Sequence, residues 1–247
     1  MRTERIAIAY RLTFESAFHF GTGLRGGLID RLVARNADGF LYVPGSTLKG
    51  VLRERCEQLA ELFDLEATSP HVEAWREANR RDPDIVARIF GTRFLPGNVY
   101  FDDAQMLEDD QALFDTDEKE RKAEFRTWQT EQRTQVAISR RTRTAQHGML
   151  YTSEYGIRDL RFEGEIVGTL TGFPLERSER GTYSLLLLLA GLKSLERIGG
   201  SKSTGAGCVT SEVTGCSVDD KPVSPADMIN CMGELEYYWL YREEATG

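Results

Sequence analysis

The chain has few cysteines, no long apolar run and no excess of basic residues. Only four of its 247 residues are cysteines, at positions 56, 208, 216 and 231, and no two form a C-x-x-C pair. We therefore expect reduced thiols and no structural zinc. The longest apolar run, 185–192, has eight residues, far short of the roughly 18 that span a bilayer. Residues 1–10 alternate polar and apolar side chains, so we expect no secretory signal, no membrane segment and a cytoplasmic location.

The charge balance argues against a free-standing nucleic-acid binder. Lys and Arg number 31 against 39 Asp and Glu, a net charge of −8, whereas binding to phosphates requires a basic surface. The charges are segregated, however. Nine acidic residues crowd positions 102–120, and the next stretch is basic, with Arg133, Arg140, Arg141, Arg143 and His147. An acidic protein arranged in this way can still hold a local basic groove.

The hydrophobic pattern predicts an α+β fold. Apolar side chains recur at every second position in 6–20, which predicts a strand, and at spacings of three and four in 48–62, which predicts a helix. Further strands are expected at 98–107, 159–170 and 208–217, and an apolar helix at 181–198. This order is that of a ferredoxin-like (RRM-like) split βαβ fold. We expect one domain, 1–247, with insertions at about 21–45, 64–97 and 108–158; the second contains helices around 72–79 and 84–90, and the third includes a strand at 149–153.

Two glycine-rich loops and one helix start suggest a site for a polyanion. Residues 21–27 follow the first strand and 199–207 follow the apolar helix. Neither has the context of a dinucleotide or mononucleotide loop: no helix follows the first, and a helix rather than a strand precedes the second. Both place exposed amides beside a cation, Arg25 or Lys202. At 44–47, Ser46 or Thr47 is expected to cap the next helix, whose first turns carry Lys49 and Arg53.

These same segments resemble the RAMP proteins. Residues 42–53 read Y-V-P-G-S-T-L-K-G-V-L-R and are preceded by His19-x-Gly21 and by G-G-L-I-D at 26–30. Residues 138–145 read I-S-R-R-T-R-T-A and are followed by Gly148-Met149-Leu150-Tyr151 and Glu154; residues 198–207 read I-G-G-S-K-S-T-G-A-G. The combination most resembles the repeated backbone subunit of type III CRISPR effector complexes (the Csm and Cmr kinds). Ser139 departs from the aspartate usual in that pattern, and 108–132 match nothing in it.

The resemblance implies a fold, partners and an activity. Such subunits stack as a filament of copies or related RAMP subunits along a guide RNA, together with the large and small subunits of the complex. The excursion between the middle strands acts as a thumb against the guide–target duplex. In active members an aspartate after the first strand cleaves the complementary target RNA, and here it corresponds to Asp30.

Asp30 is therefore the candidate catalytic residue. We expect it at the end of a short apolar strand, flanked by Arg25, Arg31 and Arg35. An aspartate can orient or deprotonate the 2′-hydroxyl of RNA, or hold a hydrated Mg²⁺ at the scissile phosphate. The products would be a 2′,3′-cyclic phosphate and a 5′-hydroxyl. We expect the other RNA contacts from His19, Arg25, Ser46, Lys49, Arg53, Arg140, Arg141, Arg143, His147, Lys202 and Ser203.

Two other functions fit the same residues. The chain would be a non-catalytic scaffold or capping subunit of the same kind of complex if Asp30 only caps a turn or pairs with Arg31. It would be a stand-alone, guide-processing RAMP ribonuclease if His19 performs acid–base chemistry on repeat RNA.

Overall fold

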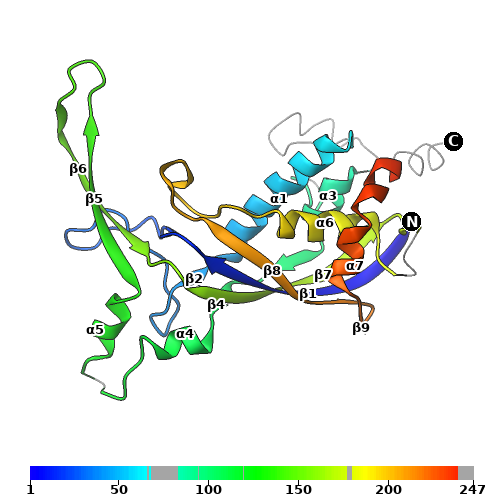
Figure 1. Ribbon diagram of the computed structural model, residues 1–247, viewed down its shortest axis with the longest axis horizontal. Coiled ribbons are helices and arrows are strands. Elements are labelled where there is room, and N and C mark those ends of the chain that lie inside the picture. The colour runs from blue at the N-terminus through cyan, green and yellow to red at the C-terminus, as the bar shows by residue number, and fades with distance from the viewer. Residues whose placement is uncertain (66, 68–82, 94, 119, 177–179, 239–247) are drawn as a thin grey trace.

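One antiparallel sheet, covered on one face by helices, forms the body of the chain (Figure 1). The computed structural model describes residues 1–65, 67, 83–93, 95–118, 120–176 and 180–238. The strands follow the order β2-β4-β7-β1-β8-β9, and β3 also pairs with β7. Their bounds are β1 Arg2–Phe14, β2 Tyr42–Val43, β3 Val99–Phe101, β4 Ala104–Met106, β7 Arg161–Gly172, β8 Val209–Val218 and β9 Lys221–Pro222.

The strand order confirms the ferredoxin-like prediction. β1 lies between β7 and β8 and is antiparallel to both. Helix α1 (Gly45–Leu62) links the first strand to β3 and β4, and helix α6 (Tyr183–Lys193) links β7 to β8. The core order from edge to edge is thus second, third, first and fourth strand, with both crossover helices packed on the same face.

The core lies between the sheet and these helices. Ile6, Ile8, Tyr10, Leu12 and Phe14 of β1 are each at most 2% exposed, as the period-two pattern predicted. Helix α6 is buried on every side because it packs against α1, α3 (Ile85–Phe90), β7 and β8. Its apolar run therefore belongs to the core and not to a functional surface.

Several predicted elements are shorter than expected. β1 ends at Phe14 rather than residue 20, and α6 ends at Lys193 rather than 198. In both places the apolar pattern continues into the loop that follows, because the loop residues Phe18 and Ile198 are buried in the core. The strand predicted at 98–107 is divided into β3 and β4, and α3 confirms the helix at 84–90; the helix predicted at 72–79 lies outside the described residues.

A two-stranded hairpin projects from one end of the sheet (Figure 1). We call it the arm: β5 (Thr130–Ile138), β6 (Ala145–Gly156) and the turn between them. Two short helices precede it, α4 (Glu108–Ala112) and α5 (Lys122–Thr127). The remaining elements are α7 (Pro225–Asn230) and the short 3₁₀ helices η1 (Lys202–Thr204) and η2 (Met232–Tyr237). Within the described ranges, every helix is too short or too polar to cross a membrane.

Candidate functional site

Three segments that are distant in sequence meet in one cleft, which we call the glycine cleft. They are the loop after β1, the first turn of α1 and the loop after α6. The cleft has a volume of about 530 Å³. Its lining residues are His19, Phe20, Gly21, Gly23, Leu24, Arg25, Asp30, Arg31, Leu32, Thr47, Gly199 and Gly200. The structure therefore brings together Asp30, His19 and Arg25, as well as parts of both glycine loops.

Glycine is required where these loops approach each other. Gly199 has a φ of +97°, in the left-handed region, and a Cβ there would lie 2.8 Å from the His19 carbonyl oxygen. Gly200 donates its backbone N–H to that same oxygen at 2.8 Å. The second glycine loop is thus fastened to the first, and backbone rather than side chains forms this wall of the cleft.

Asp30 is half-buried and is held against β6. Its backbone N–H donates to the Thr152 carbonyl oxygen at 2.8 Å, and its Oδ2 accepts from the Thr152 N–H at 3.0 Å. Within the described part of the chain, no side chain or backbone group bonds Oδ1. The short strand expected before Asp30 is not formed: Leu28 is 95% exposed, and the backbone pairings of this loop are isolated bridges.

Two of the arginines that flank Asp30 in the sequence interact with other groups. Arg35 pairs with Glu154, and the guanidinium carbon of Arg31 lies 5.3 Å from the centre of the Tyr151 ring. Within the described chain, Asp30 makes no ion pair with Arg31. Arg31 and the exposed Arg25 remain beside it on the cleft wall.

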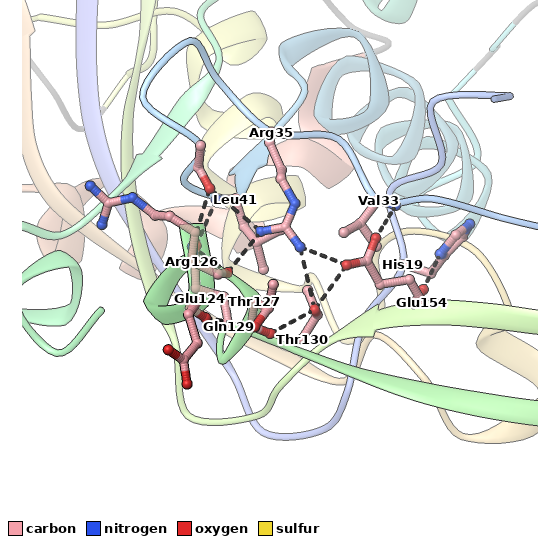
Figure 2. A network of polar contacts seen from close by, with 11 residues as sticks. His19, Val33, Arg35, Leu41, Glu124, Arg126, Thr127, Gln129, Thr130 and Glu154 are labelled. Atoms are coloured by element: carbon pink, nitrogen blue, oxygen red, sulfur yellow. Dashed lines mark hydrogen bonds and ion pairs between the residues drawn. The ribbon is translucent and has the colours of Figure 1, made fainter. Parts of the chain in front are cut away.

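Glu154 joins the cleft to the base of the arm (Figure 2). It is 6% exposed, and both carboxylate oxygens are bonded: Oε1 accepts from Arg35 at 2.6 Å and from Thr130 at 2.8 Å, and Oε2 accepts from the Val33 N–H at 3.1 Å. Its carbonyl oxygen accepts from His19 Nδ1 at 2.7 Å. A carboxylate buried with an arginine in this way sets the position of the loop that carries both His19 and Asp30.

The predicted cap of α1 is wrong. Neither Ser46 nor Thr47 caps the helix; Pro44 is the N-cap residue, and the Gly45 N–H donates to Asp103 Oδ1 at 2.8 Å. The Gly45 backbone lies so close to the strand connection that a Cβ there would overlap the Phe101 carbonyl oxygen. Ser46 is therefore exposed, with its hydroxyl released from a capping role.

Lys49 and Arg53 have different surroundings. Lys49 Nζ lies 5.8 Å from the centre of the Phe101 ring. The pKa of Lys49 is lowered, mainly by burial and to a smaller extent by repulsion from Arg53. Arg53 donates to Glu57 Oε1 at 2.9 Å and to the Gly91 carbonyl oxygen at 2.8 Å. Arg53 thus fastens α1 to the loop after α3, a structural role that the spacing of basic residues did not indicate.

Lys202 and Ser203 are exposed in η1, beside the middle of α1. Lys202 Nζ lies 3.7 Å from Glu54 Oε2. The preceding residue, Ser201, shares a hydrogen bond of 3.1 Å with the Tyr155 hydroxyl at the base of the arm. The loop therefore lies between α1 and the arm, with its cation at the surface.

Arg140, Arg141, Arg143 and His147 do not join the cleft. All four are exposed, in or next to the turn that connects β5 with β6, at the far end of the arm (Figure 1). A single groove that includes these residues with Lys49 and Lys202 is therefore not formed by this chain alone. The sequence showed that the cations cluster, and it did not show that a hairpin carries them away from the body.

Comparison with known proteins identifies the family. The RAMP superfamily profile matches residues 11–210. The chain belongs to the RAMP superfamily. No curated protein matches this RAMP protein.

Two solved structures resemble its fold. One, described as a type III-B Cmr-beta complex bound to cognate target RNA, contains a chain with a TM-score of 0.56 and 13% identity, covering 90% of this chain and 98% of that one. The other, described as the apo state of type III-B Cmr-beta, gives a TM-score of 0.53 and 13% identity over 84% of this chain and 97% of that one. At this identity, the likeness concerns the fold.

The cleft of this RAMP protein suits a metal ion only together with a ligand. Within the described residues, no group of three or more His, Cys, Asp or Glu side chains is placed to hold a metal ion. Mg²⁺ is commonly bound by one or two carboxylates with waters and substrate phosphates. Asp30 Oδ1 fits one such position, and Glu154 does not, because its oxygens already accept hydrogen bonds.

Proposed function

We propose that this RAMP protein is a backbone subunit of a type III CRISPR ribonucleoprotein, in which it binds guide RNA and cleaves complementary target RNA through Asp30. Its partners would be a guide RNA, copies of itself or related RAMP subunits in a filament, and the large and small subunits of the complex. The family and the fold of Cmr-beta subunits support this assignment. One of the similar structures is described as bound to cognate target RNA, and we extend that ligand to this chain.

The glycine cleft is the observation that carries the proposal. Exposed backbone from two glycine loops allows a ribose–phosphate strand to approach closely. Arg25 and Arg31 supply positive charge on the same wall, and Asp30 supplies one carboxylate. Further basic and hydroxyl contacts with the RNA would come from Ser46 and Lys49 of α1 and from Lys202 and Ser203 of η1.

The arm supplies a second contact with RNA, at its tip. Arg140, Arg141, Arg143 and His147 are exposed there, and within the described chain none of them forms an ion pair. Cations placed on a projecting hairpin suit a phosphate backbone that runs beside the body rather than through the cleft. In the assembled filament the arm would act as the thumb against the guide–target duplex.

The contacts of Asp30 support a role as the base. Its backbone and Oδ2 are fixed on Thr152, so that Oδ1 is presented without rearrangement. It would take the proton of the target 2′-hydroxyl or orient that group toward the adjacent phosphate, leaving a 2′,3′-cyclic phosphate and a 5′-hydroxyl. A bound Mg²⁺, held by Asp30 and the phosphate oxygens of the RNA, would stabilise the charge on the scissile phosphate.

The bond from the Thr152 N–H to Asp30 favours a second candidate, a non-catalytic scaffold. A carboxylate that accepts a backbone N–H at 3.0 Å has a structural role in holding the loop to β6. The same fold would then grip guide RNA and leave the target intact. Stand-alone processing of repeat RNA, with His19 as the acid–base group, is the third outcome to be distinguished.

Two measurements separate these candidates. The protein is purified with its partners from the host, and any bound RNA is sequenced; short RNAs with a constant 5′ portion are expected. The loaded complex is then incubated with complementary RNA and Mg²⁺. We expect the wild type to cut the target at regular intervals, and Asp30→Ala to abolish the cuts while retaining the guide RNA. An intact target would indicate the non-catalytic scaffold. Cutting of repeat RNA by the isolated chain would indicate the processing enzyme.

A further inference from the structure

The reaction proposed for the glycine cleft requires two proton transfers, and Asp30 accounts for one. When the 2′-oxygen attacks phosphorus, a bond from the 2′-oxygen to phosphorus forms and the bond from phosphorus to the 5′-oxygen breaks. The 2′-hydroxyl proton must leave, and the 5′-oxygen must gain a proton as it departs. An aspartate that accepts the first proton does not provide the second in the same step.

His19 borders the same cleft as Asp30, and one of its ring nitrogens is already bonded. His19 Nδ1 lies 2.7 Å from the Glu154 carbonyl oxygen. Because a carbonyl oxygen only accepts, Nδ1 must carry a proton and donate it. This bond leaves Nε2 as the ring nitrogen that can contact a bound RNA.

The ring of His19 is held on three sides. A Cβ on Gly21 would lie 2.9 Å from Nε2, and one on Gly200 would lie 3.3 Å from Cδ2, so both glycine loops pack directly on the ring. The Tyr155 ring lies 5.5 Å away, at 52° to it. Glu154, whose carbonyl fixes Nδ1, is itself held by Arg35 and Thr130 (Figure 2). A surface histidine used only for charge would not need this support.

We propose that His19 is the general acid of target cleavage. The inference rests on the proposed function of the cleft. The Nε2–H of the imidazolium donates its proton to the departing 5′-oxygen while the Asp30 carboxylate accepts the proton of the 2′-hydroxyl. The step leaves neutral His19 and protonated Asp30, and exchange with water restores both.

Sulfur substitution at the leaving atom tests this role. Two targets are compared in the guide-loaded complex: all-oxygen RNA, and RNA in which sulfur replaces the bridging 5′-oxygen at the cut site. A thiolate departs without a proton, so the sulfur substrate does not need a general acid. The variant is His19→Asn, because an asparagine amide can still donate to the Glu154 carbonyl while the Nε2 position is lost.

We expect His19→Asn to cut the all-oxygen target about 10²- to 10⁴-fold more slowly than the wild type. The same variant should cut the sulfur target at the wild-type rate. Asp30→Asn should be slow on both targets, because the 2′-hydroxyl must still lose its proton. His19→Gln, which cannot supply a proton either, should repeat the rescue by sulfur and serves if His19→Asn loses its guide RNA.

Other results would overturn the inference. Equal cutting of all-oxygen RNA by His19→Asn and the wild type would remove His19 from the chemistry, with the role of Asp30 intact. An equal defect on both targets would make His19 a positioning residue or a base. If the wild type binds both targets and cuts neither, the proposed cleavage itself fails, and that result is distinct from the other two.

Discussion

Arg35 Nη2 lies 2.6 Å from Glu154 Oε1, and this ion pair joins the loop of the cleft to the base of the arm. The side chains are 25% and 8% exposed, so the pair is largely removed from water. Because His19 bonds the Glu154 carbonyl and Asp30 bonds Thr152 two residues earlier, the same short piece of β6 positions both candidate catalytic groups.

Removal of Glu154 should therefore affect both stability and the cleft. Glu154→Ala leaves the Val33 N–H without its acceptor and the Arg35 guanidinium without its carboxylate partner. We expect a loss of about 3 kcal/mol in the free energy of unfolding. Glu154→Gln retains an acceptor oxygen and should lose about half as much. Urea unfolding of the isolated chains measures the difference. Identical midpoints for Glu154→Ala and the wild type would contradict this role.

Asp30→Asn separates the chemistry of Asp30 from its structural bond. An asparagine carbonyl can still accept from the Thr152 N–H, so the melting temperature and guide content should match the wild type. Target cleavage should fall by at least about 10²-fold because the base is lost. Asp38→Asn, in the turn before β2, provides a control with the same charge change and should cut normally. Full activity of Asp30→Asn would mean that another group is the base, and it would contradict the catalytic role of Asp30.

The tip of the arm should contribute to RNA affinity through charge alone. Replacing Arg140, Arg141 and Arg143 with Gln should weaken binding and reduce the slope of log K against log salt by about 2 to 3, near one unit per lost phosphate contact. A control with the same charge change uses Arg2, Arg5 and Lys221, which lie at the other end of the sheet. An equal loss of slope in both variants would mean that the arm has no special place on the RNA.

Replacement of Lys49 by an uncharged residue should stabilise the fold and weaken RNA binding. The pKa of Lys49 is lowered, because the folded protein disfavours the charged form of its side chain. This charge therefore reduces the free energy of unfolding by its full amount at neutral pH. The loss of stability is relieved as the pH rises through the lowered pKa toward 10.5. Lys49→Met should raise the melting temperature at pH 7, with a smaller gain at pH 10, and should weaken RNA binding. Melting curves at the two pH values measure this, and a lower melting temperature at pH 7 would contradict it.

The sequence predicted the fold better than it predicted the site. Alternation in β1 and the apolar run of α6 set the topology because burial in the core is repeated over many residues. The two glycine loops and Arg25 were also predicted to belong to one polyanion site, and the resemblance to one family added Asp30 and His19. The hydrogen bonds around this site were not predicted, because they depend on partners that are distant in sequence: Asp103 for the Gly45 N–H at the start of α1, and Glu154 for Arg35.

Photocrosslinking of bound RNA to the protein, with peptides identified by mass spectrometry, locates the RNA on the surface. If RNA binds in the glycine cleft, we expect crosslinks in residues 19–32, at the start of α1 and in residues 199–204, with further crosslinks at the tip of the arm. Crosslinks confined to the uncovered face of the sheet, around Arg5 and Arg11 of β1, would contradict the account, because the glycine cleft would then not be the RNA-binding site.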